Sequence, residues 1–131
     1  MQALEGHNLS VVRHTKGKLP SLPFVRMRDR VLGKSYELSI SFVNRETSRR
    51  LNREFRNKDY STNILSFGLE KNSGELVISL EKVRSGAREH DKTYHEFLGF
   101  LIIHGMLHLK GMDHGSTMEM HEEKFAKEFG F

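Results

Sequence analysis

The chain has 131 residues, of which 37% are hydrophobic and 29% are charged. This balance excludes an intrinsically disordered chain, which would contain fewer core-forming residues and a larger net charge, and it predicts a single domain over residues 1–131. The formal net charge of +4 is compatible with an anionic partner such as RNA but does not require one.

The sequence contains no cysteine. Disulfides therefore cannot stabilise the fold, and any metal site has to use His, Asp or Glu ligands. No apolar run is long enough to cross a membrane, and the polar, mixed residues 1–19 are not typical of a secretory signal. We expect a soluble, cytoplasmic protein that does not associate with membranes.

The first half of the chain predicts strands that are separated by helices. Apolar residues alternate with serines over residues 36–43, which is the period-two pattern of a half-buried strand. Asn44 is a suitable N-cap for the helix that follows. The predicted elements are a strand at 8–14, a helix at 20–32, a strand at 36–43, a helix from 44 to about 55, and a loop at 57–61.

The second half predicts a hairpin-like pair of strands and then two helices. The elements are strands at 62–67 and 75–80, separated by a turn at 70–74, and helices at 93–110 and 116–129. The helix at 93–110 is apolar around almost its whole circumference, which indicates a buried helix, and Gly111 is expected to end it in a left-handed conformation. Together the elements predict an α+β fold, with a mixed sheet of about four or five strands packed with helices and a buried central helix.

Three histidines lie at the end of this buried helix and in the loop after it. His104 and His108 are four residues apart, so their side chains share one helix face, and after Gly111 the chain can turn back to bring in His114. Three histidine ligands leave one position of a tetrahedral zinc ion open, which is the catalytic arrangement. Imidazole also binds Ni²⁺ and other divalent metals. We predict one metal ion here, Zn²⁺ by preference, rather than three unrelated histidines.

The remaining histidines show no comparable grouping, and we expect them on the surface: His7, His14, His90, His95 and His121. The spacing of the three grouped histidines is that of the metzincin proteases, in which a glutamate that acts as general base follows the first histidine. Gly105 occupies this position. A metallopeptidase therefore remains an alternative only if another carboxylate, such as Glu75 or Glu119, lies near the metal.

Three segments carry a resemblance to a known family. Residues 104–114 have the pattern His-Gly-x-Leu-His-Leu-x-Gly-x-Asp-His, residues 51–59 and 62–67 read LNREFRNKD and TNILSF, and residues 74–79 read GELVIS. In this order they resemble the bacterial YbeY family of metal-dependent endoribonucleases, and the resemblance covers roughly residues 40–125. Gly68, Met112 and Glu75 depart from the family pattern, which usually has Pro, Tyr and Asp there.

The resemblance implies a zinc-dependent endoribonuclease that is specific for single-stranded RNA. It further implies a role in ribosomal RNA maturation and ribosome quality control, including 16S rRNA 3′ end processing, with the ribosome or ribosomal proteins as further partners. Arg56 matches the family's characteristic arginine, and its implied role is to stabilise the charge that develops on the attacked phosphodiester. Arg53 and Lys58 are candidate RNA contacts. The nucleophile, either activated water or a substrate 2′-hydroxyl, remains open.

A third interpretation belongs to a different class of function. The chain would then be a ribosome-associated binding protein in which the metal has a structural role. In that case, removal of the metal would unfold the protein, and no RNA cleavage would depend on the histidines.

Overall fold

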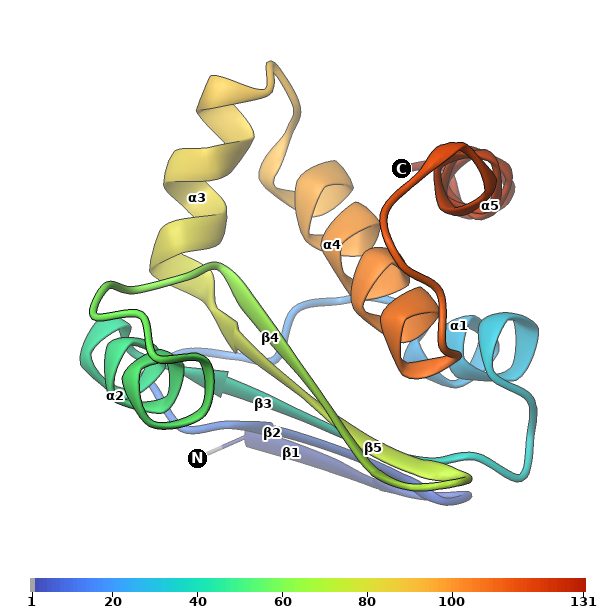
Figure 1. The fold of residues 1–131 in the computed structure, drawn as a ribbon, viewed down its shortest axis with the longest axis horizontal. Coiled ribbons are helices and arrows are strands. Elements are labelled where there is room, and N and C mark those ends of the chain that lie inside the picture. Colours follow the sequence, from blue (N-terminus) through green and yellow to red (C-terminus); the bar gives the residue numbers. More distant parts are fainter. Residues whose placement is uncertain (1) are drawn as a thin grey trace.

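In the computed structural model, which describes residues 2–131, five strands form one mixed sheet (Figure 1). The strands are β1 (Gln2–Gly6), β2 (Leu9–Arg13), β3 (Glu37–Val43), β4 (Ile64–Glu70) and β5 (Ser73–Ser79). Their order across the sheet is β1-β2-β3-β5-β4, with β2, β3 and β5 parallel to one another and the edge strands β1 and β4 antiparallel to their neighbours. The predicted mixed sheet is confirmed.

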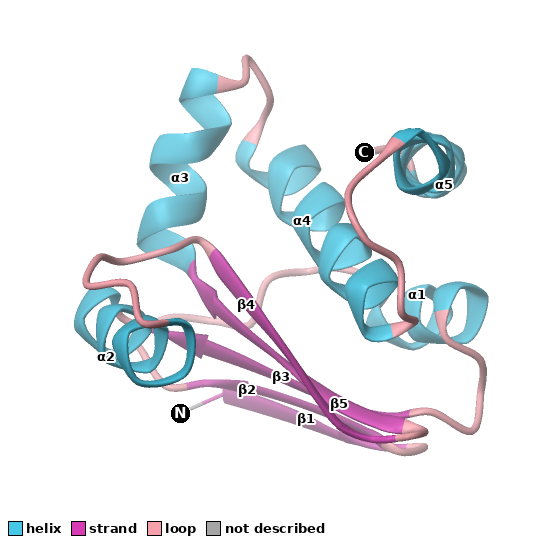
Figure 2. Ribbon diagram, viewed as in Figure 1, coloured by secondary structure: helices cyan, strands magenta, loops and turns pink. Residues whose placement is uncertain are grey.

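Helices cover both faces of this sheet (Figure 2). They are α1 (Phe24–Val31), α2 (Arg45–Arg56), α3 (Leu80–Glu89), α4 (Tyr94–Leu109) and α5 (Ser116–Phe129). One helix, α2, lies against one face, and the other four contribute to a larger core on the opposite face. The architecture is the predicted α+β class. None of the helices in residues 2–131 combines the length and apolar character needed to cross a bilayer.

The alternation along β3 determines which core each side chain enters. Leu38, Ile40 and Phe42 are buried in the larger core beneath α4. Successive strand residues point to opposite faces, so Val43 enters the smaller core beneath α2. That smaller core consists of Val43, Leu65 and Val77, with Leu51 and Phe67 packed against it.

The α4 helix is buried around most of its circumference, as its sequence predicts. It begins with a capping box, in which Thr93 accepts a hydrogen bond from the Glu96 backbone N–H and the Glu96 carboxylate accepts one from the Thr93 N–H. It ends at Leu109, and Gly111, the residue after the C-cap, has a φ of +103°. The Met112 N–H donates to the Leu107 carbonyl over 3.0 Å. This is a Schellman ending, so the chain turns sharply where the prediction placed the stop.

Two elements were not predicted from the sequence. Strand β1 is an exposed edge strand, and its pattern carries little hydrophobic signal. It pairs with β2 through a two-residue turn at His7 and Asn8, whose φ values of 53° and 62° are typical of a type I′ hairpin. Helix α3 buries only Leu80, Val83 and Ala87, so its apolar face is narrow.

Several predicted boundaries were wrong. Helix α1 begins at Phe24 rather than at residue 20, because Pro23 disfavours the helical conformation at the residue before it. Strand β4 continues to Glu70, which pairs with Ser73. The turn of this hairpin is therefore residues 71–72 and not 70–74, and β5 begins two residues earlier than predicted.

Candidate metal centre

Three histidines meet at the C-terminal end of α4. Candidate ligand nitrogens of His104, His108 and His114 all lie within 4.8 Å of one another. The Nε2 atoms of His104 and His108 face each other across one helical turn and are 3.1 Å apart. Two nitrogens that bind one tetrahedral zinc ion at 2.0–2.1 Å are separated by about 3.3 Å. The donor set and its spacing therefore fit a single shared ion.

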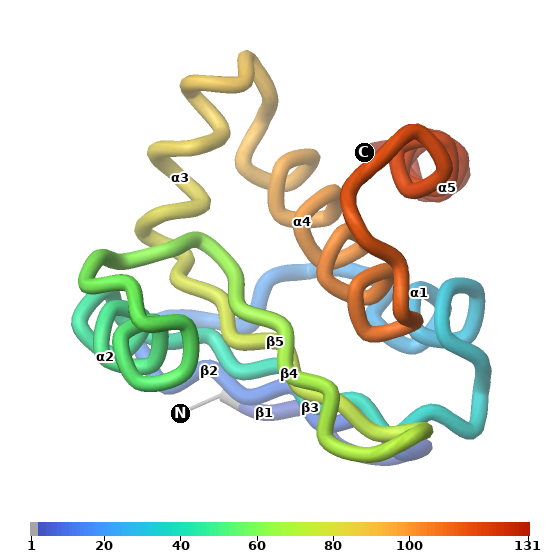
Figure 3. Tube along the Cα trace, viewed as in Figure 1, coloured from blue at the N-terminus to red at the C-terminus, as the bar shows by residue number. Residues whose placement is uncertain are grey.

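His114 reaches the cluster from the connection between α4 and α5. The trace in Figure 3 shows this connection turning back beside the end of α4 before α5 begins. The His114 ring centroid is 5.2 Å from that of His104 and 4.8 Å from that of His108. His114 is exposed, whereas the two helix histidines are half-buried. The cluster is therefore open to solvent on the His114 side.

The Nδ1 atom of each helix histidine has an oxygen partner. His104 Nδ1 lies 3.0 Å from Oε2 of Glu122, and His108 Nδ1 lies 3.0 Å from the Met112 carbonyl oxygen. Carbonyl and carboxylate oxygens accept hydrogen bonds, so the geometry assigns the donor role to each Nδ1. In the neutral form of each imidazole, this arrangement leaves Nε2 with a free lone pair for a metal.

The surroundings of His108 favour its neutral form. Burial lowers the pKa of His108 most strongly, and the neighbouring His104 lowers it further. The hydrogen bond to the Met112 carbonyl acts in the opposite direction but does not reverse the shift. Because only neutral imidazole binds a metal, this environment keeps His108 in its binding form at neutral pH.

Glu122 was not predicted as part of this site. It lies on α5 and is buried, and a carboxylate that deep in the protein needs a partner. Its sequence position carried a usable signal, because it lies one turn after the buried Met118 and one turn before the buried Ala126. A glutamate on the apolar face of an amphipathic helix indicates a buried polar contact, here with His104.

Gly105 faces the sheet rather than the histidine cluster. A Cβ atom there would lie 2.8 Å from both Ile64 Cδ1 and Leu76 Cδ2, so the glutamate of the metzincin pattern would displace strand side chains. Glu75 is adjacent to Leu76 in β5 and therefore lies on the sheet face away from α4. The carboxylate that contacts His104 is Glu122 and not Glu119. These positions do not favour a peptidase.

Arg56 ends α2 and reaches β4, an edge strand of the sheet. Its guanidinium donates to the Ser66 carbonyl over 2.7 Å and to the Phe55 carbonyl over 3.2 Å, and it lies 5.0 Å above the centre of the Phe67 ring. The Ser66 hydroxyl is 3.5 Å from the Gly105 carbonyl of α4. One residue of β4 thus connects Arg56 to the residue that follows His104.

The other two predicted RNA contacts lie nearby on α2 and the loop after it. Arg53 is 3.6 Å from the Asp59 carboxylate. Arg49 donates two hydrogen bonds to the same carboxylate, over 2.9 Å and 3.2 Å. Lys58 is exposed in the loop that contains Asp59. The structure therefore places Arg53 in a surface ion-pair network, a position that the sequence did not indicate.

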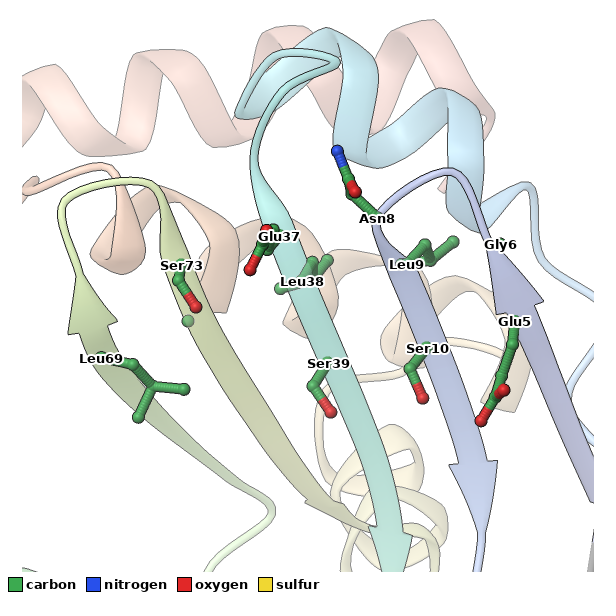
Figure 4. A pocket seen from close by; sticks show the side chains of 11 residues that line it. Glu5, Gly6, Asn8, Leu9, Ser10, Glu37, Leu38, Ser39, Leu69 and Ser73 are labelled. Carbon is green, nitrogen blue, oxygen red and sulfur yellow. The ribbon is translucent and has the colours of Figure 1, made fainter.

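A separate depression lies on the sheet face away from α4. Figure 4 shows Glu5, Ser10, Ser39 and Leu69 pointing into it from four different strands. Its lining includes none of the predicted site residues. The candidate metal centre is therefore distinct from this depression.

Comparison with known proteins agrees with this geometry. Residues 22–130 match the family model for endoribonuclease YbeY. The chain is 35% identical to the endoribonuclease YbeY of Acidovorax ebreus, over 88% of this chain and 82% of that protein. It is 42% identical to that of Alkaliphilus oremlandii, over 70% of this chain and 69% of that protein.

A solved structure has a similar fold. A solution structure of a Thermotoga maritima protein superposes with a TM-score of 0.62 and 28% sequence identity, covering 81% of this chain and 75% of that one. The residues matched by the family model include the three histidines and Arg56. The chain therefore belongs to the YbeY endoribonuclease family.

Proposed function

We propose that this protein is a zinc-dependent endoribonuclease that cleaves single-stranded RNA during ribosomal RNA maturation. The observation that carries this proposal is the convergence of two Nε2 atoms 3.1 Å apart while both Nδ1 atoms are held by oxygen partners. Family membership supports an RNA substrate. An association with the ribosome and a cytoplasmic location are part of the same proposal, since bacterial ribosomal RNA is made and processed in the cytoplasm.

In this proposal His104, His108 and His114 hold the metal. Three neutral imidazoles can bind Zn²⁺ in a tetrahedral arrangement with one position left open. Imidazoles also bind Ni²⁺. When bound, the ion would supply a Lewis acid that polarises the phosphodiester and lowers the pKa of water. Glu122 and the Met112 carbonyl keep the two helix histidines oriented for this role.

Arg56 supplies the positive charge for the phosphate. A guanidinium has five N–H donors; Nη1 and Nη2 of Arg56 each direct one of theirs to a backbone carbonyl, which leaves donors for phosphate oxygens. Because arginine stays charged at all relevant pH values, Arg56 would stabilise the charge that develops during cleavage. Lys58 and Arg53 would contact flanking phosphates. Arg53 would give up its ion pair with Asp59 to bind a phosphate of the RNA.

The chemical ends of the products would identify the nucleophile. Attack by the substrate 2′-hydroxyl leaves a 2′,3′-cyclic phosphate, whereas attack by water does not. Replacing the 2′-hydroxyl next to the cleaved bond with hydrogen would abolish the first route and leave the second. The described residues support either route equally.

The test is cleavage of a labelled single-stranded ribosomal RNA fragment by wild type, His108→Ala and His121→Ala proteins, purified identically. His121 is a half-buried histidine of α5 outside the cluster, so its variant controls for the loss of any histidine. We expect cleavage by wild type and His121→Ala only. Equal cleavage by all three proteins would identify a contaminating nuclease, and loss of metal from His108→Ala without loss of cleavage would exclude a catalytic metal.

A further inference from the structure

An aromatic ring is exposed where α2 approaches β4. Phe55 is 58% exposed, although Leu51, one turn earlier on the same helix, packs against the smaller core. Single exposed apolar residues are common and carry no meaning alone. The Phe55 ring, however, packs against the Phe67 ring in an edge-to-face arrangement, with centroids 5.4 Å apart and an interplanar angle of 70°. The protein thus holds an aromatic ring in a defined orientation while leaving it accessible.

Fixed positive charge lies beside this ring. The Arg56 guanidinium is 5.0 Å above the Phe67 ring and is held there by hydrogen bonds to the Ser66 and Phe55 carbonyls. Lys58 is exposed two residues further along the chain. Proteins that bind single-stranded nucleic acid combine these two features, with bases stacking on aromatic rings and the phosphate backbone following the cations.

The position of Phe55 and Phe67 relative to the histidines would allow one RNA strand to reach both. Phe67 neighbours Ser66 in β4, and Ser66 contacts Gly105, which follows His104. In the sheet formed by residues 2–131, β4 is an edge strand, so the Phe55 ring on the α2 face and α4 on the opposite face lie on either side of that edge. A nucleotide on Phe55 would therefore place its phosphate near Arg56, and the next nucleotides would pass around the β4 edge to reach the histidine cluster.

We propose that Phe55, oriented by Phe67 and flanked by Arg56, is a base-stacking subsite for an unpaired nucleotide of a single-stranded RNA. The inference rests on the proposed function and adds that this subsite selects RNA with unpaired bases. A base within a duplex is already paired and stacked between its neighbours, so it cannot stack on Phe55 without first being unpaired. The subsite would thus contribute to the preference for single strands.

The experiment uses protein freed of metal with a chelator, so that binding is measured without cleavage. The probe is a short single-stranded RNA with 2-aminopurine at one position, moved along the strand, because the fluorescence of this base is quenched when it stacks. We expect wild type to quench it at a restricted set of positions. Phe55→Ala should remove this quenching and weaken binding about 5- to 150-fold, the range for loss of one base–aromatic stack.

Three further variants make the result specific. Phe55→Trp should keep both quenching and affinity, whereas Phe55→Leu keeps an apolar side chain without an aromatic ring and should lose the quenching. Leu4→Ala removes an exposed apolar residue from β1, at the opposite edge of the sheet, and should bind like wild type. Circular dichroism and urea unfolding establish that each variant is folded.

The outcomes separate this inference from the proposed function. If Phe55→Ala binds and quenches like wild type while cleavage still depends on His108, the stacking subsite is wrong and the endoribonuclease stands. If Phe55→Ala weakens the binding of single-stranded and double-stranded RNA equally, Phe55 does not select unpaired bases and the inference is again wrong. If wild type binds no RNA, both fail, and the exposed ring becomes a candidate contact for a protein.

Discussion

The Nδ1 atom of His104 lies 3.0 Å from Oε2 of Glu122 and joins α4 to α5 beside the histidine cluster. The side chains are 20% and 9% exposed, so water competes little for this hydrogen bond. A carboxylate that accepts a hydrogen bond from Nδ1–H fixes the ring orientation and makes Nε2 a better electron donor. Glu122 is therefore a positioning residue for His104.

Replacing Glu122 should weaken metal binding without removing a ligand. We expect Glu122→Ala to lower the affinity for Zn²⁺ about 10- to 100-fold, the usual effect of losing a partner of a metal-bound histidine. Glu122→Gln should lose less affinity for Zn²⁺, because the amide oxygen can still accept the hydrogen bond from His104 Nδ1–H. Competition with a chromophoric chelator measures the affinities, and an Ala variant that binds like wild type would contradict the assigned role.

Arg56 should affect cleavage and not metal content. Arg56→Ala is expected to slow single-turnover cleavage about 100- to 1,000-fold, the effect of removing one preorganised donor at a developing negative charge. Arg56→Lys keeps the charge but not the planar fork, so it should restore only part of the rate. Arg50→Ala, which removes another exposed arginine of α2, is the control. Equal single-turnover cleavage rates for Arg56→Ala and Arg50→Ala would show that Arg56 has no specific role in cleavage.

The stability of the metal-free protein should depend on pH through His108. Its pKa in the folded protein is lowered from 6.5, chiefly by burial, so between the folded pKa and 6.5 the unfolded chain binds more protons. The stability contributed by neutral His108 is thus present above 6.5 and is lost as the pH falls through 6.5 towards the folded pKa.

Urea unfolding of the chelated protein at several pH values measures this effect. The carboxylates of the protein add their own pH dependence, so the informative quantity is the difference between wild type and His108→Gln. Wild type should lose more stability than the variant as the pH falls below 6.5. Parallel pH profiles for the two proteins would show that His108 titrates normally.

Leu107 tests the buried character of α4 independently of function. Its side chain is fully buried, and Leu107→Ala should lower the free energy of unfolding by about 2–5 kcal/mol. Leu69 is 62% exposed on β4, and Leu69→Ala should change the free energy of unfolding by less than about 0.5 kcal/mol. Similar urea midpoints for the two variants would contradict the packing of α4.

Local patterns in the sequence were sufficient to predict most of the elements and the histidine cluster. The alternation over residues 36–43 identified β3, and the all-round apolar pattern identified α4. The spacing of His104 and His108 placed them one turn apart on a single helix face, and the stop at Gly111 allowed His114 to join them. These predictions succeed because helix and strand periods fix which side chains share a face.

The tertiary structure alone determined what lies opposite those faces. Glu122 is 18 residues from His104 in the sequence, and Phe67 lies 12 residues after Phe55. Neither pairing follows from a repeat period, because each depends on how two separate elements pack against each other. Packing also explains Gly105, whose neighbours on β4 and β5 leave no room for a side chain as large as glutamate. The sequence thus determined which histidines come together as candidate ligands, and the packing of α4 against α5 and the sheet determined how they are oriented.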